Sequence, residues 1–269
     1  MSKAGELLNS SKKIVLKIGS NVLTGESGEM EMSAVENIAI QVKKLIDLGK
    51  HVVIVSSGAE VSGISAIGMW SRQGDINYKQ AMCAIGQVEL MMAYKKYFSE
   101  LGIVVGQLLL TRRDFADSNC TLNIRNTLFT LIDEGVVPII NENDSVSVDE
   151  ITLGDNDKLA ALTCNLWSGD MLILMSDIDG LYDRPPGRGE EARLIHEVTD
   201  IESLRRVVEI SGKSSFGKGG MESKIAAAEE IRKYGVPMLL VNGKAGEVLM
   251  DVLSGSEVGT IFYEEGDKR

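Results

Sequence analysis

Short, almost wholly apolar segments alternate along this chain with longer segments whose apolar residues recur every three or four positions. The first pattern is typical of strands buried on both faces, and the second of helices that pack one side against a sheet. Their alternation predicts an α/β fold, a three-layer αβα sandwich around a central, mainly parallel open β-sheet. The expected strands are Lys13–Ile18, His51–Ser56, Ile103–Leu109, Val136–Ile140, Met171–Met175, Val236–Val241 and Gly259–Phe262. The expected helices are Met32–Leu48, Lys79–Leu101, Thr121–Glu134, Asn156–Trp167, Ile201–Ser211 and Met221–Tyr234.

Composition limits the partners of this chain. It has 269 residues, 44% of them hydrophobic, and no visible interdomain linker, so we expect residues 1–269 to form a single domain. The net charge of −11 opposes a broad phosphate-binding surface and argues against nucleic acid as a partner. Because no apolar run is long enough to span a bilayer and the first residues lack a secretory hydrophobic region, we expect no membrane partner and a cytoplasmic location.

Cysteine and histidine usage argues against several kinds of site. Cys83, Cys120 and Cys164 are isolated from one another in or beside helical patterns, which indicates free thiols in a reducing compartment. His51 and His196 are the only histidines, and we interpret both as structural. The sequence therefore supports neither a histidine-based zinc site nor a Ser–His–Asp triad, and we predict no metal site built from protein side chains alone.

Two polar clusters lie where an open parallel sheet binds ligands. Asn141 and Asp144 directly follow an apolar strand, and Asn156 and Asp157 directly precede a helical pattern. Ligands bind beyond the carboxyl ends of such strands and at helix N-termini. Asn, Asp and Gly are also ordinary turn formers, but two such clusters at element ends favour a site. The mixture of amides and carboxylates suits a polar zwitterion or a metal-bound phosphate.

Three further segments are candidates for anion binding. Lys17 lies at the end of an apolar strand, where its ammonium group needs an anionic partner such as phosphate unless it reaches water. Ser57 and Gly58 open a turn between a strand and a small-residue helix, whose backbone N–H groups form an anion site for phosphate or carboxylate, although a small-residue turn after a strand is also common without one. Ser176 and Asp177 follow the apolar run MLILM, although an Asp–Gly turn explains that segment equally well.

A glycine-rich loop, SSFGKGGMESK, leads into a helix beginning near Met221, with Lys218 and Lys224 flanking the turn. It offers backbone donors and two ammonium groups to a polyphosphate, the alternative being a solvated loop. Neither GxGxxG nor GxxxxGK[ST] occurs. Separated lysines, glycine-rich turns and an Asp/Asn pair at a helix start are what phosphoryl transfer requires. No general base is evident, but a carboxylate acceptor is already ionised at neutral pH. A closing lid would protect an acyl phosphate product from water.

Eight segments resemble the amino acid kinase family, in order and across nearly the whole chain: VLKIGSNVLTG, VVIVSSGAEVSG, KQAMCAIGQVELM, GQLLLTRRDF, VVPIINENDSV, GDNDKLAAL, SDIDGLY and GKGGMESKI. NEND followed by GDND, with GGM-x-[ST]K downstream, makes them most similar to the members that phosphorylate the γ-carboxylate of L-glutamate in the first step of proline synthesis. The resemblance implies ATP and Mg²⁺ as cofactors, feedback inhibition by proline, and a homo-oligomer, either dimer or tetramer. It also implies that residues to about 165 mainly bind glutamate and that residues 166–269 mainly bind ATP.

The resemblance also implies roles for individual residues. The implied catalytic residues are Lys17, Asp157 and Lys224. The implied glutamate-binding residues are Ser57, Gly58, Asn141, Asp144 and Asn156. The implied ATP-binding residues are Lys17, Ser176, Asp177, Lys218, Gly219, Gly220, Met221, Glu222, Ser223 and Lys224.

Two departures from the family pattern limit what the resemblance implies. Lys218 stands where members commonly have threonine, which could add a positive charge near the phosphates. Many members also carry a C-terminal PUA domain, and we expect this chain to lack one. The alternatives are a member acting on aspartate, acetylglutamate, carbamate or UMP, and a catalytically silent nucleotide or amino acid sensor on the same fold.

Overall fold

A single mixed β-sheet organises the computed structural model, which describes residues 1–68, 74–147, 156–184, 192–202, 204 and 220–264. Within this eight-stranded sheet, the six strands from β3 to β9 in the order of pairing are all parallel to their neighbours. Strand β10 runs antiparallel to β9, and β8 pairs parallel with β10. The mainly parallel sheet confirms the predicted fold class. In order of pairing, the eight strands are β3 (Val104–Leu110), β4 (Val136–Glu142), β2 (His51–Ser56), β1 (Lys13–Ile18), β5 (Met171–Ser176), β9 (Met238–Asn242), β10 (Thr260–Phe262) and β8 (Glu197–Val198).

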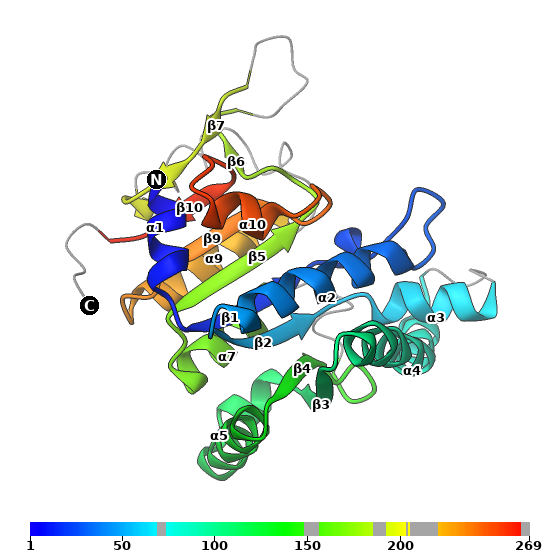
Figure 1. Cartoon of the computed structure of the whole chain (residues 1–269). Coiled ribbons are helices and arrows are strands. Elements are labelled where there is room, and N and C mark those ends of the chain that lie inside the picture. Colours follow the sequence, from blue (N-terminus) through cyan, green and yellow to red (C-terminus); the bar gives the residue numbers. More distant parts are fainter. Residues whose placement is uncertain (69–73, 148–155, 185–191, 203, 205–219, 265–269) are drawn as a thin grey trace.

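Helices cover both faces of the sheet, and Figure 1 shows α2 crossing in front of β1 and β2. The layer on the α2 side consists of α1 (Lys3–Ser10), α2 (Met32–Asp47), α4 (Ile76–Glu100) and α10 (Val248–Leu253). The opposite layer consists of α5 (Ser118–Asp133), α7 (Asn156–Trp167) and α9 (Gly220–Arg232). The remaining elements are α3 (Ala59–Ile67), the 3₁₀ turns η1 (Ser20–Val22) and η2 (Arg112–Phe115), and a hairpin of β6 (Leu181–Tyr182) and β7 (Leu194–Ile195).

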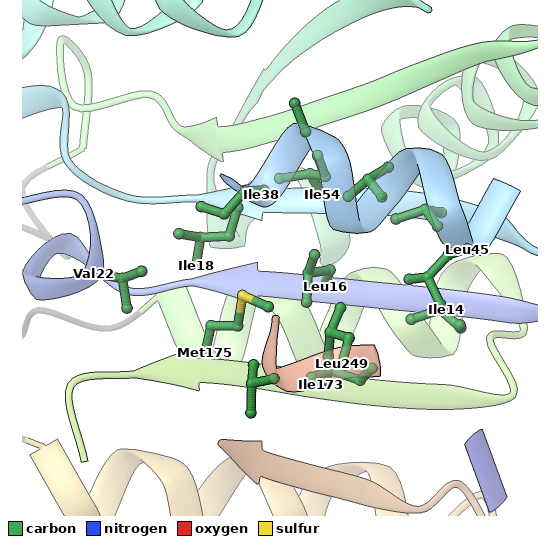
Figure 2. Close-up of a cluster of buried hydrophobic side chains, with 14 of the residues drawn as sticks. Ile14, Leu16, Ile18, Val22, Ile38, Leu45, Ile54, Ile173, Met175 and Leu249 are labelled. Atoms are coloured by element: carbon green, nitrogen blue, oxygen red, sulfur yellow. The ribbon is translucent and has the colours of Figure 1, made fainter. Parts of the chain in front are cut away.

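The alternation of side chains along β1 decides which layer each residue meets. Leu16 and its even-numbered neighbours pack into the core beneath α2 and α10, where Figure 2 shows them beside Ile38 and Leu249. Val15 packs into the core on the other face. Because side chains alternate between the two faces of a strand, Lys17 shares the face of Val15 and projects toward α7 and α9.

Two glycines let α3 and α4 approach backbone to backbone. A Cβ atom on Gly86 would lie 1.8 Å from the carbonyl oxygen of Ala59, and one on Gly63 would lie 1.9 Å from the carbonyl oxygen of Met82. Only glycine fits at such a contact, because any side chain would collide with rigid backbone. The tight pairing fixes α4 beside the end of β4, where its polar side chains become part of the site described below.

Several expected elements differ in extent from the structure. β4 continues through Asn141 and Glu142, which pair with Leu109 and Leu110 of β3, so these two polar residues belong to the strand rather than following it. Helices α1 and α10 were not predicted, because each is too short to show a clear period. Most of the expected helix at 201–211 lies outside the described residues. Within the described part of the chain, no helix is both long and apolar enough to cross a bilayer.

Candidate active site

Asp157 lies between two lysines that come from opposite ends of the sequence. Its Oδ1 is 2.5 Å from Nζ of Lys17 on β1, and its Oδ2 is 3.3 Å from Nζ of Lys224 on α9. Ser223 donates a hydrogen bond to the same Oδ2 at 2.8 Å. All three charged side chains are at most 9% exposed. The predicted catalytic residues therefore meet in one buried cluster, although no prediction was made of the Ser223 contact.

The charges of this cluster support one another. Burial raises the pKa of the Asp157 carboxyl, but the positive charges of Lys17 and Lys224 outweigh that effect and lower it to about 2. Asp157 is therefore ionised throughout the neutral range and holds two ammonium groups close together. Two cations meeting one carboxylate leave a net positive charge at the carboxyl end of β1, which suits a bound anion such as a phosphate.

A network of buried amides joins the two predicted polar clusters. The two Nδ2 hydrogens of Asn156, the first residue of α7, are shared among three acceptors: the Ser56 carbonyl at 2.8 Å, Oγ of Ser57 at 3.1 Å and Oδ1 of Asn141 at 2.8 Å. Oδ1 of Asn156 is buried and has no hydrogen-bond partner among the described residues. The network thus fixes the Asn156 side chain and leaves one acceptor atom for a ligand.

The turn after β2 is held by one backbone hydrogen bond and depends on one glycine. The Ser57 N–H donates to the carbonyl of Ile18 at 3.0 Å, which ties this turn to the end of β1. Gly58 has φ of 97° and precedes α3. This left-handed conformation strains residues with a side chain, so glycine is required for the turn.

Residues predicted to border the nucleotide lie on the other side of Lys17. Ser176 ends β5 and donates to Oδ1 of Asp177 at 3.2 Å, while Asn21 of η1 donates to Oδ2 of Asp177 at 2.9 Å. Gly220 begins α9, and its carbonyl accepts a hydrogen bond from Lys224 at 3.1 Å. In the remaining predicted loop, Glu222 is exposed and Met221 is buried in the core, while Lys218 and Gly219 lie outside the described residues.

Sequence reasoning missed a set of α4 residues that contact the end of β4. Gln80 donates to the carbonyl of Asp144 at 2.8 Å, and Oε1 of Gln87 accepts from Nδ2 of Asn141 at 2.9 Å. Cys83, between them on α4, hydrogen-bonds the Asp144 side chain. The spacing of these three residues places them on one helix face, and such a polar stripe within an apolar pattern is the signal that could have identified them.

A cleft of about 610 Å³ opens where α4, β3 and the end of β4 meet. This volume is in the range of small-molecule sites. Its polar lining includes Cys83, Gln87, Gln107, Glu142, Asn143 and Asp144.

Asp144 combines burial with neighbouring negative charge. Burial raises the pKa of its carboxyl, and the carboxylates of Glu142 and Glu60 raise it further. A hydrogen bond from Cys83 lowers the pKa, and the resulting pKa of Asp144 is about 7. Its Oδ1 is buried without a hydrogen-bond partner among the described residues. An ammonium group of a ligand would supply both a donor and a compensating charge, so Asp144 fits a cationic ligand group.

The raised pKa of Asp144 predicts a pH-dependent loss of stability. The folded state retains the Asp144 proton up to about pH 7, whereas the unfolded carboxyl releases it near pH 3.8. The protonated carboxyl therefore contributes fully to the free energy of unfolding below pH 3.8, and this contribution is lost as the pH rises through 7. Relative to an Asp144→Asn variant, the wild type should lose on the order of 1–3 kcal/mol of unfolding free energy over that interval. Urea denaturation of both proteins between pH 4.5 and 8 measures the difference. A wild type that gains stability relative to the variant would contradict the assignment.

Metal-binding side chains do not cluster in the part of the chain that the structure describes: no three His, Cys, Asp or Glu residues are arranged to hold an ion.

Comparison with known proteins identifies the group to which this arrangement belongs. Residues 12–242 match the model of the amino acid kinase family. The chain is 53% identical over 257 residues to a glutamate 5-kinase from Alkaliphilus metalliredigens, covering 96% of this chain and 97% of that protein. It is 46% identical to a glutamate 5-kinase from Geobacter metallireducens, covering 95% of this chain and 69% of that protein.

Solved structures show the same fold at much lower sequence identity. A carbamate kinase from Giardia lamblia bound to AMP-PNP superposes with a TM-score of 0.66 at 16% identity, covering 96% of this chain and 100% of that protein. A UMP kinase from Ureaplasma parvum superposes with a TM-score of 0.64 at 18% identity, covering 94% of this chain and 99% of that protein. With the family match over most of its length and relatives above 40% identity, this chain belongs to the amino acid kinase family, among the glutamate 5-kinases.

Proposed function

We propose that this protein transfers the γ-phosphoryl group of ATP to the γ-carboxylate of L-glutamate, giving L-glutamyl 5-phosphate in the first step of proline biosynthesis. The observation that carries the proposal is the pair of buried lysines joined by Asp157, next to a network of amides that leaves ligand-binding atoms free. The glutamate 5-kinase relatives support the choice of acceptor.

In the proposed reaction, a γ-carboxylate oxygen of glutamate attacks the γ-phosphorus of ATP. A new P–O bond forms, the bond to the bridging oxygen breaks, and ADP leaves with the electron pair. The carboxylate is ionised at neutral pH and needs no base. Lys17 and Lys224 would neutralise charge that develops on the phosphoryl oxygens, while Asp157 keeps both ammonium groups in place.

The acceptor and the nucleotide would occupy the two halves of the chain. Ser57, Gly58, Asn141, Asp144 and Asn156, all before residue 165, would bind glutamate. The ATP-binding set would lie mainly within residues 166–269: Ser176, Asp177, Gly220, Met221, Glu222, Ser223 and Lys224, with Lys218 and Gly219, and with Lys17 reaching in from β1.

Mg²⁺ fits this proposal as a companion of ATP. The ion usually keeps several waters and binds substrate phosphates with one or two carboxylates. Asp177, which accepts hydrogen bonds from Asn21 and Ser176 beside the lysines, is a carboxylate that could serve this purpose. The ion would supply further neutralisation of the phosphate charge.

Three wider properties are part of the proposal. None of the three cysteines forms a disulfide, which supports a cytoplasmic location. Val88 and Met92 of α4 are 59% and 61% exposed, which supports association of this chain into a dimer or tetramer. A monomer in light scattering would contradict that association.

Proline would inhibit the enzyme by competing with glutamate. Inhibition kinetics at varied glutamate concentration would test this.

An acceptor comparison tests the proposed reaction. ADP formation should be measured with Mg-ATP and L-glutamate, L-aspartate, N-acetyl-L-glutamate, carbamate or UMP. We expect kcat/KM for glutamate to exceed that of every other acceptor by about a hundredfold or more, because buried polar atoms left unpaired by a wrong ligand are costly. Preference for another acceptor would replace the substrate assignment, and no turnover with any of them would favour a silent sensor.

A further inference from the structure

The Gln87 carboxamide has one paired atom and one unpaired atom. Its Oε1 accepts a hydrogen bond from Nδ2 of Asn141 at 2.9 Å. Its Nε2 is buried and has no hydrogen-bond partner among the described residues. A buried amide donor without a partner costs free energy comparable to a lost hydrogen bond, so a ligand group that accepts from it would be favoured.

Backbone atoms fix which end of each amide is free. Oδ1 of Asn141 accepts from the backbone N–H of Glu142 at 2.9 Å, and a backbone N–H can only donate. The Asn141 amide nitrogen must then face Gln87, which must present its oxygen in return. The Gln87 Nε2 group is therefore left as the free donor by the hydrogen-bond network itself.

The free donor lies in the same cleft as a free carboxylate oxygen. Gln87 and Asp144 both line the 610 Å³ cleft, and Oδ1 of Asp144 is buried without a hydrogen-bond partner among the described residues. An N–H donor and a carboxylate together match the head group of an α-amino acid, which carries one carboxylate and one ammonium group. The γ-carboxylate of the acceptor would be the end that reaches Lys17, leaving the head group for the cleft.

We propose that Nε2 of Gln87 binds the α-carboxylate of the amino acid acceptor, opposite the ammonium group bound by Asp144, and so makes the site selective for acceptors with that carboxylate. This inference rests on the proposed function, because it assumes an amino acid acceptor. Lys95 also lines the cleft but is exposed, and solvent screening makes an exposed lysine a weak discriminator.

Two substitutions of Gln87, tested against three ligands, examine the proposal. Gln87→Met keeps the volume but removes the donor and acceptor, whereas Gln87→Glu keeps an oxygen for Asn141 but replaces the donor with a second oxygen and adds a negative charge. The ligands are L-glutamate, glutarate, which lacks the α-ammonium group, and 4-aminobutyrate, which lacks the α-carboxylate. Calorimetry on the full chain at pH 8, where Asp144 is ionised, gives each dissociation constant. Thermal unfolding confirms that each variant is folded.

Both Gln87 variants should bind glutamate and glutarate about tenfold to a hundredfold more weakly than the wild type, because a hydrogen bond to a charged group is lost. The affinity of Gln87→Met for 4-aminobutyrate should stay within about threefold of the wild type, because that ligand has no α-carboxylate to lose a contact. Gln87→Glu should not weaken the binding of 4-aminobutyrate, because its added negative charge does not repel an ammonium group. Asp144→Asn should show the crossed pattern, weakening glutamate and 4-aminobutyrate but not glutarate.

Two outcomes would overturn the assignment of Gln87. Equal weakening of all three ligands would show that Gln87 acts only through Asn141, and unchanged glutamate affinity in both variants would show that it contacts no ligand. Failure of the proposed function is a separate result, since it would appear as a wild type that neither binds nor phosphorylates glutamate.

Discussion

Asp157→Asn is expected to reduce kcat by about a hundredfold to a thousandfold, the scale of losing one preorganised electrostatic element of a transition state. Asparagine has nearly the same shape, but it lacks the charge that holds Lys17 and Lys224 at 2.5 and 3.3 Å from the carboxylate. Without it the two ammonium groups repel one another and lose their common position. Because the pKa of Asp157 is about 2, the wild-type activity should show no titration of this group between pH 5 and 8.

Asp170→Asn provides the matched control. Asp170 accepts hydrogen bonds from the backbone N–H groups of Lys12 and Lys13 at 2.9 and 2.8 Å, at the opposite end of β1 from the site. Its substitution should alter stability without altering kcat. Steady-state assays with saturating ATP and glutamate, together with thermal unfolding of both variants, separate the two effects. Unchanged turnover in Asp157→Asn would refute the catalytic role and make a silent sensor the better interpretation.

The fold could be predicted because it depends on patterns that the backbone enforces, whereas the catalytic cluster was implied by the family resemblance. Apolar runs such as the one containing Lys17 are buried on both faces, and the carboxyl end of a parallel strand places its last side chains beside the start of a covering helix. The sheet topology is consistent with a lysine at the end of β1 lying near an aspartate at the start of α7, but the grouping of Lys17, Asp157 and Lys224 was implied by the family resemblance.

Features that depend on strand direction or exact packing could not be predicted in the same way. The apolar run of β10 fits either direction, and only its pairing with β9 shows that it is antiparallel. The strand character of Asn141 and Glu142 arises from pairing with β3, which overrides their preference for turns. Gln87 lies within a long helical pattern, and its hydrogen bond to Asn141 depends on how α4 packs, including the close contact of α4 with α3 at Gly86.

The second large effect is expected at Lys17, for which Lys17→Met should lower kcat by about a hundredfold to a thousandfold. The side chain is 7% exposed and its ammonium group lies 2.5 Å from Asp157, so no solvent ion can take its place at the transferring phosphate. Lys17→Arg should not restore activity, because the larger planar guanidinium does not fit this enclosed position. Lys13→Met is the control, since Lys13 lies on the same strand and face but contacts Trp167 and Phe129 instead.

Combining Lys17→Met with Lys224→Met distinguishes a shared role from two separate ones. If both ammonium groups act on one phosphoryl group, kcat of the double variant should fall by far less than the product of the two single reductions. Removing either lysine already disables the pair, so removing the second costs little more. Presteady-state measurement of a single turnover keeps slow product release from hiding the chemical step. Losses that multiply fully would mean that the two lysines act on different anions, and Asp157 would then be a structural link between separate sites rather than the organiser of one.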